Sequence, residues 1–147
     1  MKSLSLQTSS IAASMTVSID TLAKKLKAEG KDIVSLGAGE PDFKTPEIIR
    51  NAAKEAIEQG KTKYVAPTGL EEVRKAVANK LQKENGLSYS ANQIVLTSGA
   101  KQAVFNSLAA LINPDDEIII PAPYWVTYPE LVKWFKGVPV FIETTPE

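Results

Sequence analysis

An α/β fold with a parallel sheet is the architecture that this sequence predicts, and three observations indicate it. Short apolar runs at 93–97, 117–120 and 138–143 have the length of buried strands. Segments with helical spacing of apolar residues lie between them, at 100–112 and 124–135. Strands and helices that alternate in this way are joined by right-handed crossovers, which make the strands parallel.

The N-terminal third predicts a mixture of helix and loop. Residues 1–14 are rich in Ser and show no periodicity, so we expect an irregular arm. Residues 17–29 carry apolar side chains on one helical face, and Gly30 is the natural stop. A short strand is expected at 31–36. The glycines and proline of the next segment, 37–43 (GAGEPDF), indicate a loop with a particular backbone path.

Two further helices are expected in the middle of the chain. Thr45 suits a cap and Pro46 suits the first position of a helix that ends at Gly60. Another helix is expected over 70–84. Each carries an apolar stripe that predicts burial on one side. The segment 100–112 is apolar nearly all round, which predicts burial on several sides.

Composition narrows the chemistry before any motif is considered. The 147 residues are 44% hydrophobic, with 17 basic and 17 acidic side chains, so no field of one sign favours a nucleic acid or an anionic membrane as partner. The absence of Cys and His excludes disulfides, thiolate metal sites and Ser-His catalysis within this chain. No apolar run approaches the ~20 residues of a membrane span. We expect a cytoplasmic protein.

The turn between the run at 93–97 and the following helix is a candidate anion site. Amide groups at a helix N-terminus, together with the helix dipole, favour phosphate. Gly99 lets the backbone approach closely, Ser98 adds a hydroxyl and Lys101 adds charge. A purely structural turn is the other interpretation. No Walker or G-x-G-x-x-G fingerprint is present, which counts against a nucleotide-binding domain.

Aromatic residues follow the next predicted strand. Tyr124, Trp125 and Tyr128 come directly after it, and in a parallel sheet this loop should lie beside the anion turn. Their rings could stack on a flat ligand. The alternative is that Trp125 and Tyr128 are core residues at helical spacing.

Four motifs in this order resemble the pyridoxal-phosphate-dependent aminotransferases of class I, near aspartate aminotransferase. They are GAGEPDF, GKTKYVAPTGLEEVRKAV, TSGAKQAVFNSLAAL and PAPYWVTYPE. The resemblance covers nearly the whole chain and implies a fold-type-I enzyme. It implies an arm and part of the small domain in 1–45, and the first part of the cofactor-binding large domain in 46–147. The predicted sheet ends near Glu147 with an unpaired edge, and the family's chains are over twice this long, so we expect an N-terminal portion.

The resemblance also implies roles for individual residues toward the cofactor, pyridoxal 5'-phosphate. Gly99, Ala100 and Lys101 match the turn that binds its phosphate. Trp125 would stack on the pyridine ring and contact substrate. Tyr64 would reach across a homodimer interface to the neighbour's cofactor phosphate.

The substrate side of the site is implied by resemblance as well. Gly39 would contact the α-carboxylate of the substrate through its main chain. Ser14, Thr16 and Lys101 lie near the position where related enzymes recognise an acidic side chain. No lysine here matches the one that carries the cofactor, so the chain holds no catalytic residue and is expected to be inactive alone.

The activity implied for the whole enzyme is transfer of an amino group between an amino acid, with aspartate expected, and a 2-oxo acid. Aromatic, alanine and prephenate aminotransferases are the close alternatives. A non-catalytic α/β binding fragment is the alternative outside enzymes.

Overall fold

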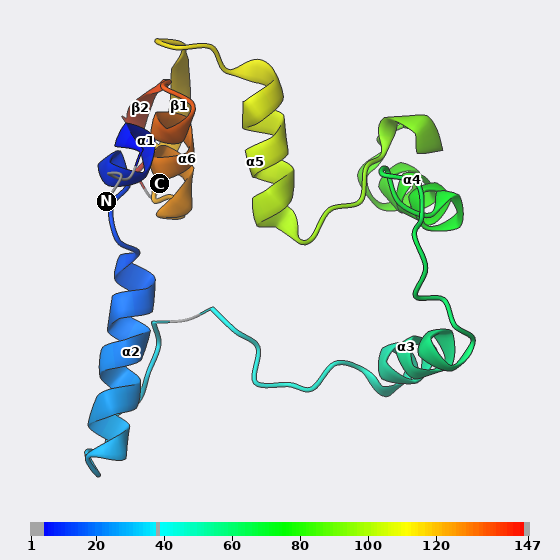
Figure 1. The fold of residues 1–147 in the computed structure, drawn as a ribbon, viewed down its shortest axis with the longest axis horizontal. Helices are drawn as coiled ribbons and strands as arrows, with labels where there is room; N and C mark the ends of the chain where they lie inside the picture. Colours follow the sequence, from blue (N-terminus) through cyan, green and yellow to red (C-terminus); the bar gives the residue numbers. More distant parts are fainter. Residues whose placement is uncertain (1–4, 38, 146–147) are drawn as a thin grey trace. The chain divides into compact units, whose positions relative to one another are not determined.

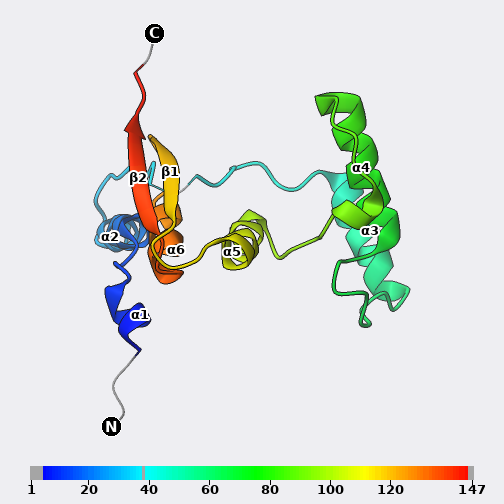
Figure 2. The same ribbon diagram turned by 90° about the horizontal axis from the view of Figure 1, so that it is seen from above.

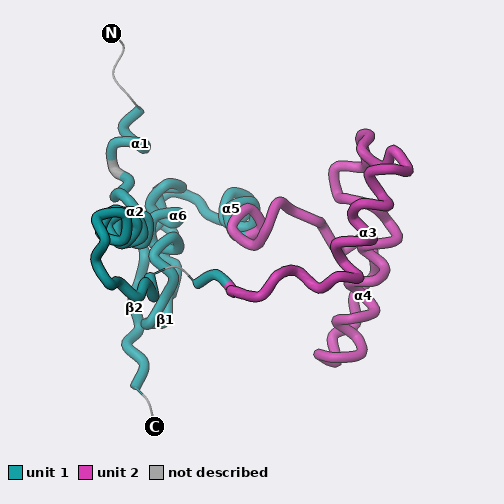
Figure 3. Tube along the Cα trace, turned by 90° about the horizontal axis from the view of Figure 1, so that it is seen from below, with its two compact units in different colours: residues 1–40, 104–147 teal, residues 41–103 magenta. Residues whose placement is uncertain are grey.

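The structure of the chain is a computed structural model that describes residues 5–37 and 39–145, apart from the side chain of Ser10. It contains two compact units (Figure 3). Unit 1 combines residues 1–40 with 104–147, and unit 2 is residues 41–103. Each unit is described by itself. Parts of the predicted arm and of the GAGEPDF loop, at 1–4 and 38, lie outside the described residues.

Unit 1 is built on a two-stranded parallel sheet (Figure 1). Strand β1 (Glu117–Ala122) pairs with β2 (Val138–Glu143), with Glu117 opposite Val138. Helix α6 (Thr127–Trp134) makes the crossover and contacts both strands (Figure 2). Val132 of α6 and Ile120 of β1 are buried, at 1% and 5% exposure. The predicted α/β class and parallel pairing are therefore confirmed.

The N-terminal part of unit 1 differs from expectation in two places. The arm is not wholly irregular, because α1 (Leu6–Ser10) is a short helix in which the Ser5 hydroxyl accepts from the Thr8 amide at 3.2 Å. It contacts α6. The strand expected at 31–36 was wrong, since these residues form no ladder. A short extended segment becomes a strand only when another strand pairs with it.

Helix α2 (Met15–Ala28) begins at an identifiable cap. The Ser14 hydroxyl accepts from the Val17 amide at 3.4 Å. Within the helix, Asp20 and Lys24 form an ion pair at 2.7 Å. The hydrogen bond from Lys24 to Asp20, reinforced by the charge of that carboxylate, raises the pKa of the Lys24 ammonium. The local signals therefore define this helix without help from neighbouring elements.

Unit 2 holds α3 (Glu47–Glu58), α4 (Glu71–Asn85), the short 3-10 helix η1 (Ala91–Gln93), and residues 100–103 of α5 (Ala100–Leu111). Thr45 was wrongly expected to cap α3, because Pro46 occupies the cap position and forms no side-chain cap bond. Gly86 ends α4 with a φ of 68°. This left-handed conformation favours glycine over residues that carry a Cβ.

Two expectations about the middle of the chain are corrected. Residues 93–97 do not form a strand, because no described strand pairs with them. The apolar stripes are also less buried than expected: α3 and α5 have no buried residue, and only Ala78 of α4 is buried. A stripe is buried only where a second surface covers it, and neither α2 nor α3 contacts another described helix or strand.

Candidate functional site

The turn at the start of α5 has the form of an anion-binding N-terminus. Gly99 has a φ of 83°, and a Cβ built there would meet no atom within 4 Å. The Ala103 amide donates to the Gly99 carbonyl at 3.4 Å, which begins the backbone hydrogen bonding of the helix. The amides of Ala100 and Lys101 precede it, where a helix offers no carbonyl partner. These two donors and the helix dipole therefore suit an anion.

Side chains of the same segment fix the shape of this turn. Thr97 Oγ1 donates to the Gly99 carbonyl at 3.0 Å, and the Gly99 amide donates to the Thr97 carbonyl at 2.8 Å. Gln102 Oε1 accepts from the Ser98 amide at 2.6 Å. Sequence reasoning missed Gln102, although a Gln in the first helical turn is a known signal for capping. Because Gln102 accepts from the Ser98 amide, the amides that remain to bind an anion are those of Ala100 and Lys101.

A phosphate group fits this turn by the chemistry of the donors present. Ser98, Gly99, Ala100 and Lys101 are all exposed, so a ligand can approach them from solvent. Glycine at 99 leaves room for close approach, the amides supply directed hydrogen bonds, and the Lys101 ammonium supplies a positive charge. The phosphate of pyridoxal phosphate therefore matches the donor set that this structure presents.

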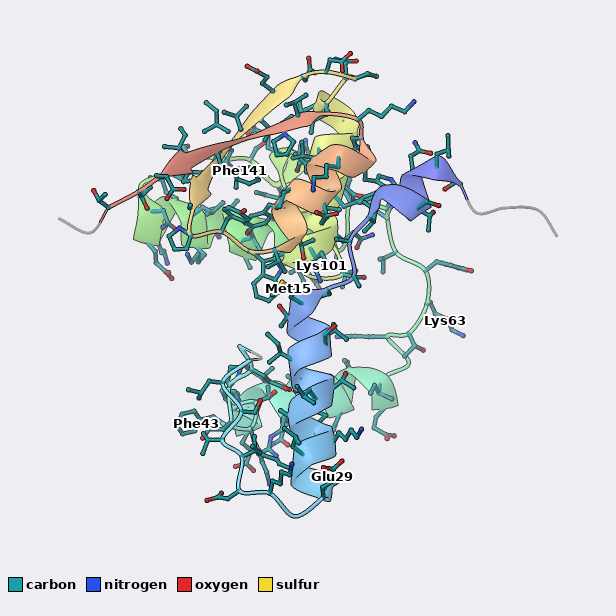
Figure 4. The ribbon with its side chains drawn as sticks, turned by 90° about the vertical axis from the view of Figure 1, so that its left-hand side faces the viewer. Met15, Glu29, Phe43, Lys63, Lys101 and Phe141 are labelled. Atoms are coloured by element: carbon teal, nitrogen blue, oxygen red, sulfur yellow. The ribbon has the colours of Figure 1, made fainter. Side chains whose placement is uncertain are left out.

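Tyr64 lies in the loop between α3 and α4. Its side chain is fully exposed, and that of the adjacent Lys63 projects away from the chain (Figure 4). The loop closes at its far end with a bond from the Gly69 amide to the Ala66 carbonyl, at 2.8 Å. A loop with a fully exposed tyrosine is suited to a contact outside its own unit.

Trp125 belongs to unit 1, between β1 and α6. Its side chain is 47% exposed in this chain, so part of the ring is open to solvent. Its carbonyl accepts from the Tyr128 amide at 3.0 Å, within the first turn of α6. A cavity of about 470 Å³ opens beside it, lined by apolar side chains that include Val104 and Leu108 of α5 and Val132. Tyr124 instead stacks on Phe141, with centroids 4.9 Å apart.

The arm meets α6 beside a second cavity in unit 1, of about 760 Å³. The Ala12 amide donates to Glu130 Oε2 at 3.1 Å, and Lys133 Nζ lies 2.9 Å from Glu130 Oε1. The hydrogen bond from Lys133 is the main reason that the pKa of the Glu130 carboxyl lies below its usual value, and the Ala12 amide adds to it. Ser14 and Met15 line the cavity. Sequence reasoning missed Glu130.

The predicted site residues are divided between the two units. Unit 2 holds the residues predicted to contact the phosphate, which are Tyr64, Gly99, Ala100 and Lys101. Unit 1 holds the predicted substrate contacts and the predicted stacking ring, which are Thr16, Gly39 and Trp125. Thr16 is half-buried in the first turn of α2, and Gly39 is exposed with open space beside it. The side-by-side arrangement of the two loops stays a prediction.

The described residues contain neither a cluster of metal-ligating side chains nor a membrane-spanning helix. No group of three or more His, Cys, Asp or Glu side chains is placed to hold a metal ion. None of the described helices is both long and apolar enough to cross a membrane.

Comparison with known proteins identifies the family. The sequence profile of the aminotransferase class I and II family matches residues 31–147. The chain belongs to this family. The match includes all four motifs that carry the resemblance, from the GAGEPDF loop to the segment around Trp125.

Individual aminotransferases match along all or most of the chain. A probable aspartate/prephenate aminotransferase of Thermus aquaticus is 48% identical over 147 residues, which are 100% of this chain and 38% of that protein. An aspartate aminotransferase of Rhizobium meliloti is 48% identical over 91% of this chain and 33% of its own length. The chain therefore spans little more than a third of these relatives.

The fold matches solved aminotransferases to the same extent. The structure titled aspartate aminotransferase from Thermus thermophilus with maleate has a TM-score of 0.95 and 46% identity, over 99% of this chain and 38% of that one. The class I and II aminotransferases depend on pyridoxal phosphate. The predicted family and the predicted α/β fold are both confirmed.

Proposed function

We propose that this chain supplies the phosphate-binding turn and the ring-stacking side chain of a pyridoxal-phosphate-dependent aminotransferase. The observation that carries the proposal is the turn at Gly99, with the amides of Ala100 and Lys101 at the N-terminus of α5. Trp125 supports it, since its half-exposed ring beside an apolar cavity offers a face to a flat ligand. The positions of these residues in the family's motifs support both assignments.

Each residue then has a defined task. When bound, pyridoxal phosphate supplies an electron sink for chemistry at the substrate's Cα. The turn at 98–101 holds the phosphate and so fixes the ring, and Trp125 restricts its tilt. Gly39 presents main-chain groups to the substrate's α-carboxylate. The residue that moves the Cα proton is not supplied by these 147 residues, because no lysine occupies a matching position.

The proposed substrate pair is aspartate and a 2-oxo acid. The relatives named aspartate or aspartate/prephenate aminotransferase, and the Thermus thermophilus structure titled with maleate, favour an acidic substrate side chain. Thr16 lies in the first turn of α2, where amides and a hydroxyl suit a carboxylate. Aromatic, alanine or prephenate transamination are the alternatives within the family.

A homodimer in the cytoplasm, with a role in amino acid biosynthesis, completes the proposal. Its support is the family's motif at Lys61–Tyr64 and the full exposure of the Tyr64 side chain. In such a dimer, Tyr64 would donate to the cofactor phosphate of the neighbouring subunit. The division into 1–45 and 46–147 belongs to the same proposal.

The test removes one phosphate contact at a time in a complete aminotransferase that carries these residues. Lys101→Ala removes a charge and Ala100→Pro removes an amide at the first helical position, which tolerates proline. We expect each to raise the Kd of pyridoxal phosphate by roughly tenfold, the loss of one charge-assisted bond.

Matched controls use the same changes elsewhere. Lys54→Ala and Glu47→Pro alter α3, Glu47 being its first residue, and should leave that Kd within about twofold. Unchanged cofactor affinity in both Lys101→Ala and Ala100→Pro would contradict the proposal.

A further inference from the structure

The loop that carries Tyr64 is joined directly to the segment that enters α5. The Leu96 amide donates to the Thr68 carbonyl at 3.1 Å. Both groups lie in unit 2, so the contact belongs to one compact body. Leu96 precedes Gly99 by three residues, and this bond therefore ties the end of the Tyr64 loop to the approach of the phosphate-binding turn.

Side-chain packing at Gly69 reinforces this connection. Gly69 has a φ of 91°, and a Cβ there would lie 2.6 Å from Leu96 Cδ1 and 2.8 Å from Leu96 Cβ. Both the backbone conformation and the close approach require glycine. The loop and the segment at 94–97 therefore lie in direct van der Waals contact.

Arg74 holds the two sides of this connection. Its Nε donates to the Gly69 carbonyl at 3.3 Å, and its Nη1 donates to the Ala91 carbonyl at 2.7 Å. The Ala91 carbonyl also accepts from the Ile94 amide at 3.3 Å, where η1 passes into the segment leading to α5. Arg74 is half-buried, whereas Arg50, the other arginine of the chain, is exposed. A planar guanidinium can bind two separate carbonyls in fixed geometry, which an ammonium cannot do as well.

We infer that Arg74 is a positioning residue that holds the Tyr64 loop and the phosphate-binding turn in fixed relation to each other. It acts through the Gly69 and Ala91 carbonyls and touches no proposed ligand. The inference rests on the proposed function, which gives the turn and the Tyr64 loop their roles. In the proposed homodimer one chain's turn serves its own cofactor and its Tyr64 serves the neighbour's, so Arg74 sets the geometry of two sites.

Amide hydrogen exchange of the 147-residue chain tests the inference without turnover. In Arg74→Ala we expect the Gly69 and Leu96 amides to exchange about tenfold faster, the effect of losing roughly one hydrogen bond's free energy. Amides in the middle of α4, around Ala78, should change less than about twofold to threefold. Arg74→Lys should resemble Arg74→Ala, and Arg50→Ala should resemble the wild type.

Added methylguanidinium gives a readout that general destabilisation would not produce. It should restore protection of the Leu96 amide in Arg74→Ala, whereas methylammonium should not. Unchanged exchange at Leu96 in Arg74→Ala, or an equal loss of protection throughout α4, would overturn the inference. Full protection in Arg74→Lys would also overturn it, because one donor point would then suffice.

A titration with inorganic phosphate separates this inference from the proposed function. The wild-type chain should show shifts of the Ala100 and Lys101 amide resonances, with weaker binding in Arg74→Ala. Equal binding by both proteins would contradict the positioning role alone. Absence of shifts in the wild type would contradict the phosphate site, while the exchange results would still decide whether Arg74 holds the two segments together.

Discussion

Glu130 illustrates how one side chain can connect segments distant in the sequence. Its two carboxylate oxygens take different partners, the Ala12 amide of the arm and the Lys133 ammonium of α6. The Lys133 contact is a local i, i+3 pair within α6, whereas the Ala12 contact joins residues 118 apart and no local pattern predicts it. The carboxylate thereby fixes the end of the arm two residues before Ser14, whose hydroxyl caps α2.

The lowered pKa of Glu130 predicts a pH-dependent attachment of the arm. A carboxyl group whose pKa is lower in the folded state stabilises that state at higher pH, and loses this effect as pH falls below the usual value of 4.5. We expect the Ala12 amide, corrected for intrinsic exchange, to be protected at pH 6 and to lose protection as the pH falls below 4.5. Glu130→Gln should remove this dependence.

Glu58→Gln is the matched control, since that side chain lies at the exposed end of α3. It should preserve the wild-type profile at Ala12. The same pH dependence in Glu130→Gln as in the wild type would show that another group controls the arm. The free energy involved is on the order of 1 kcal/mol, because the pair lies at the surface.

The helices were largely predictable because their signals are local. The expected helix at 17–29 is Met15–Ala28, and that at 70–84 is Glu71–Asn85. Apolar spacing and a following glycine are enough to define such elements. The strands at 31–36 and 93–97 were wrong, since a strand depends on a partner that no local pattern reveals. The pair β1 and β2 was found because both runs are apolar and joined by a helix.

The packing of α6 on the sheet depends chiefly on Val132. This side chain is 1% exposed, whereas Val138 at the start of β2 is 43% exposed. We expect Val132→Ala to lower the free energy of unfolding by roughly 1–3 kcal/mol, through lost burial and the cavity left behind.

Val138→Ala is the control for that substitution and should cost under about 1 kcal/mol, because it removes less buried surface. Urea unfolding of the two variants beside the wild type measures both values. Equal losses would mean that α6 and the sheet do not form the core of unit 1.

At the scale of the whole chain, the sequence predicts candidate parts of a site but not their assembly. The turn at Gly99 and the aromatic residue at 125 are recognisable because each lies within one continuous segment. Their mutual arrangement depends on contacts between segments, and they fall in different units. Arg74 and Glu130 were missed because each acts through a bond between segments that only the folded chain reveals. Gln102 was missed although its place in the first helical turn is a local capping signal.

Apolar side chains are exposed on two helices of this chain, which spans only part of the length of its relatives. It spans 38% of the length of the Thermus aquaticus relative, and apolar side chains on α2 and α3 are uncovered, among them Leu22, Ile48 and Ile57. Exposed apolar faces of this kind favour contact with further protein surface. The turn and the tryptophan that we propose for phosphate binding and ring stacking lie within these 147 residues, whereas no lysine here matches the one expected to carry the proton.

Glutamate formation by the 147-residue chain, given aspartate, 2-oxoglutarate and added pyridoxal phosphate, tests this account most directly. Transamination requires a base held over the substrate's Cα, and its correct placement is worth orders of magnitude in rate. Because the proposed phosphate site comes without that base, we expect glutamate to form no faster than with free pyridoxal phosphate alone. Turnover clearly above that background would contradict the account, since a lysine of this chain would then be performing the chemistry assigned to a residue outside it.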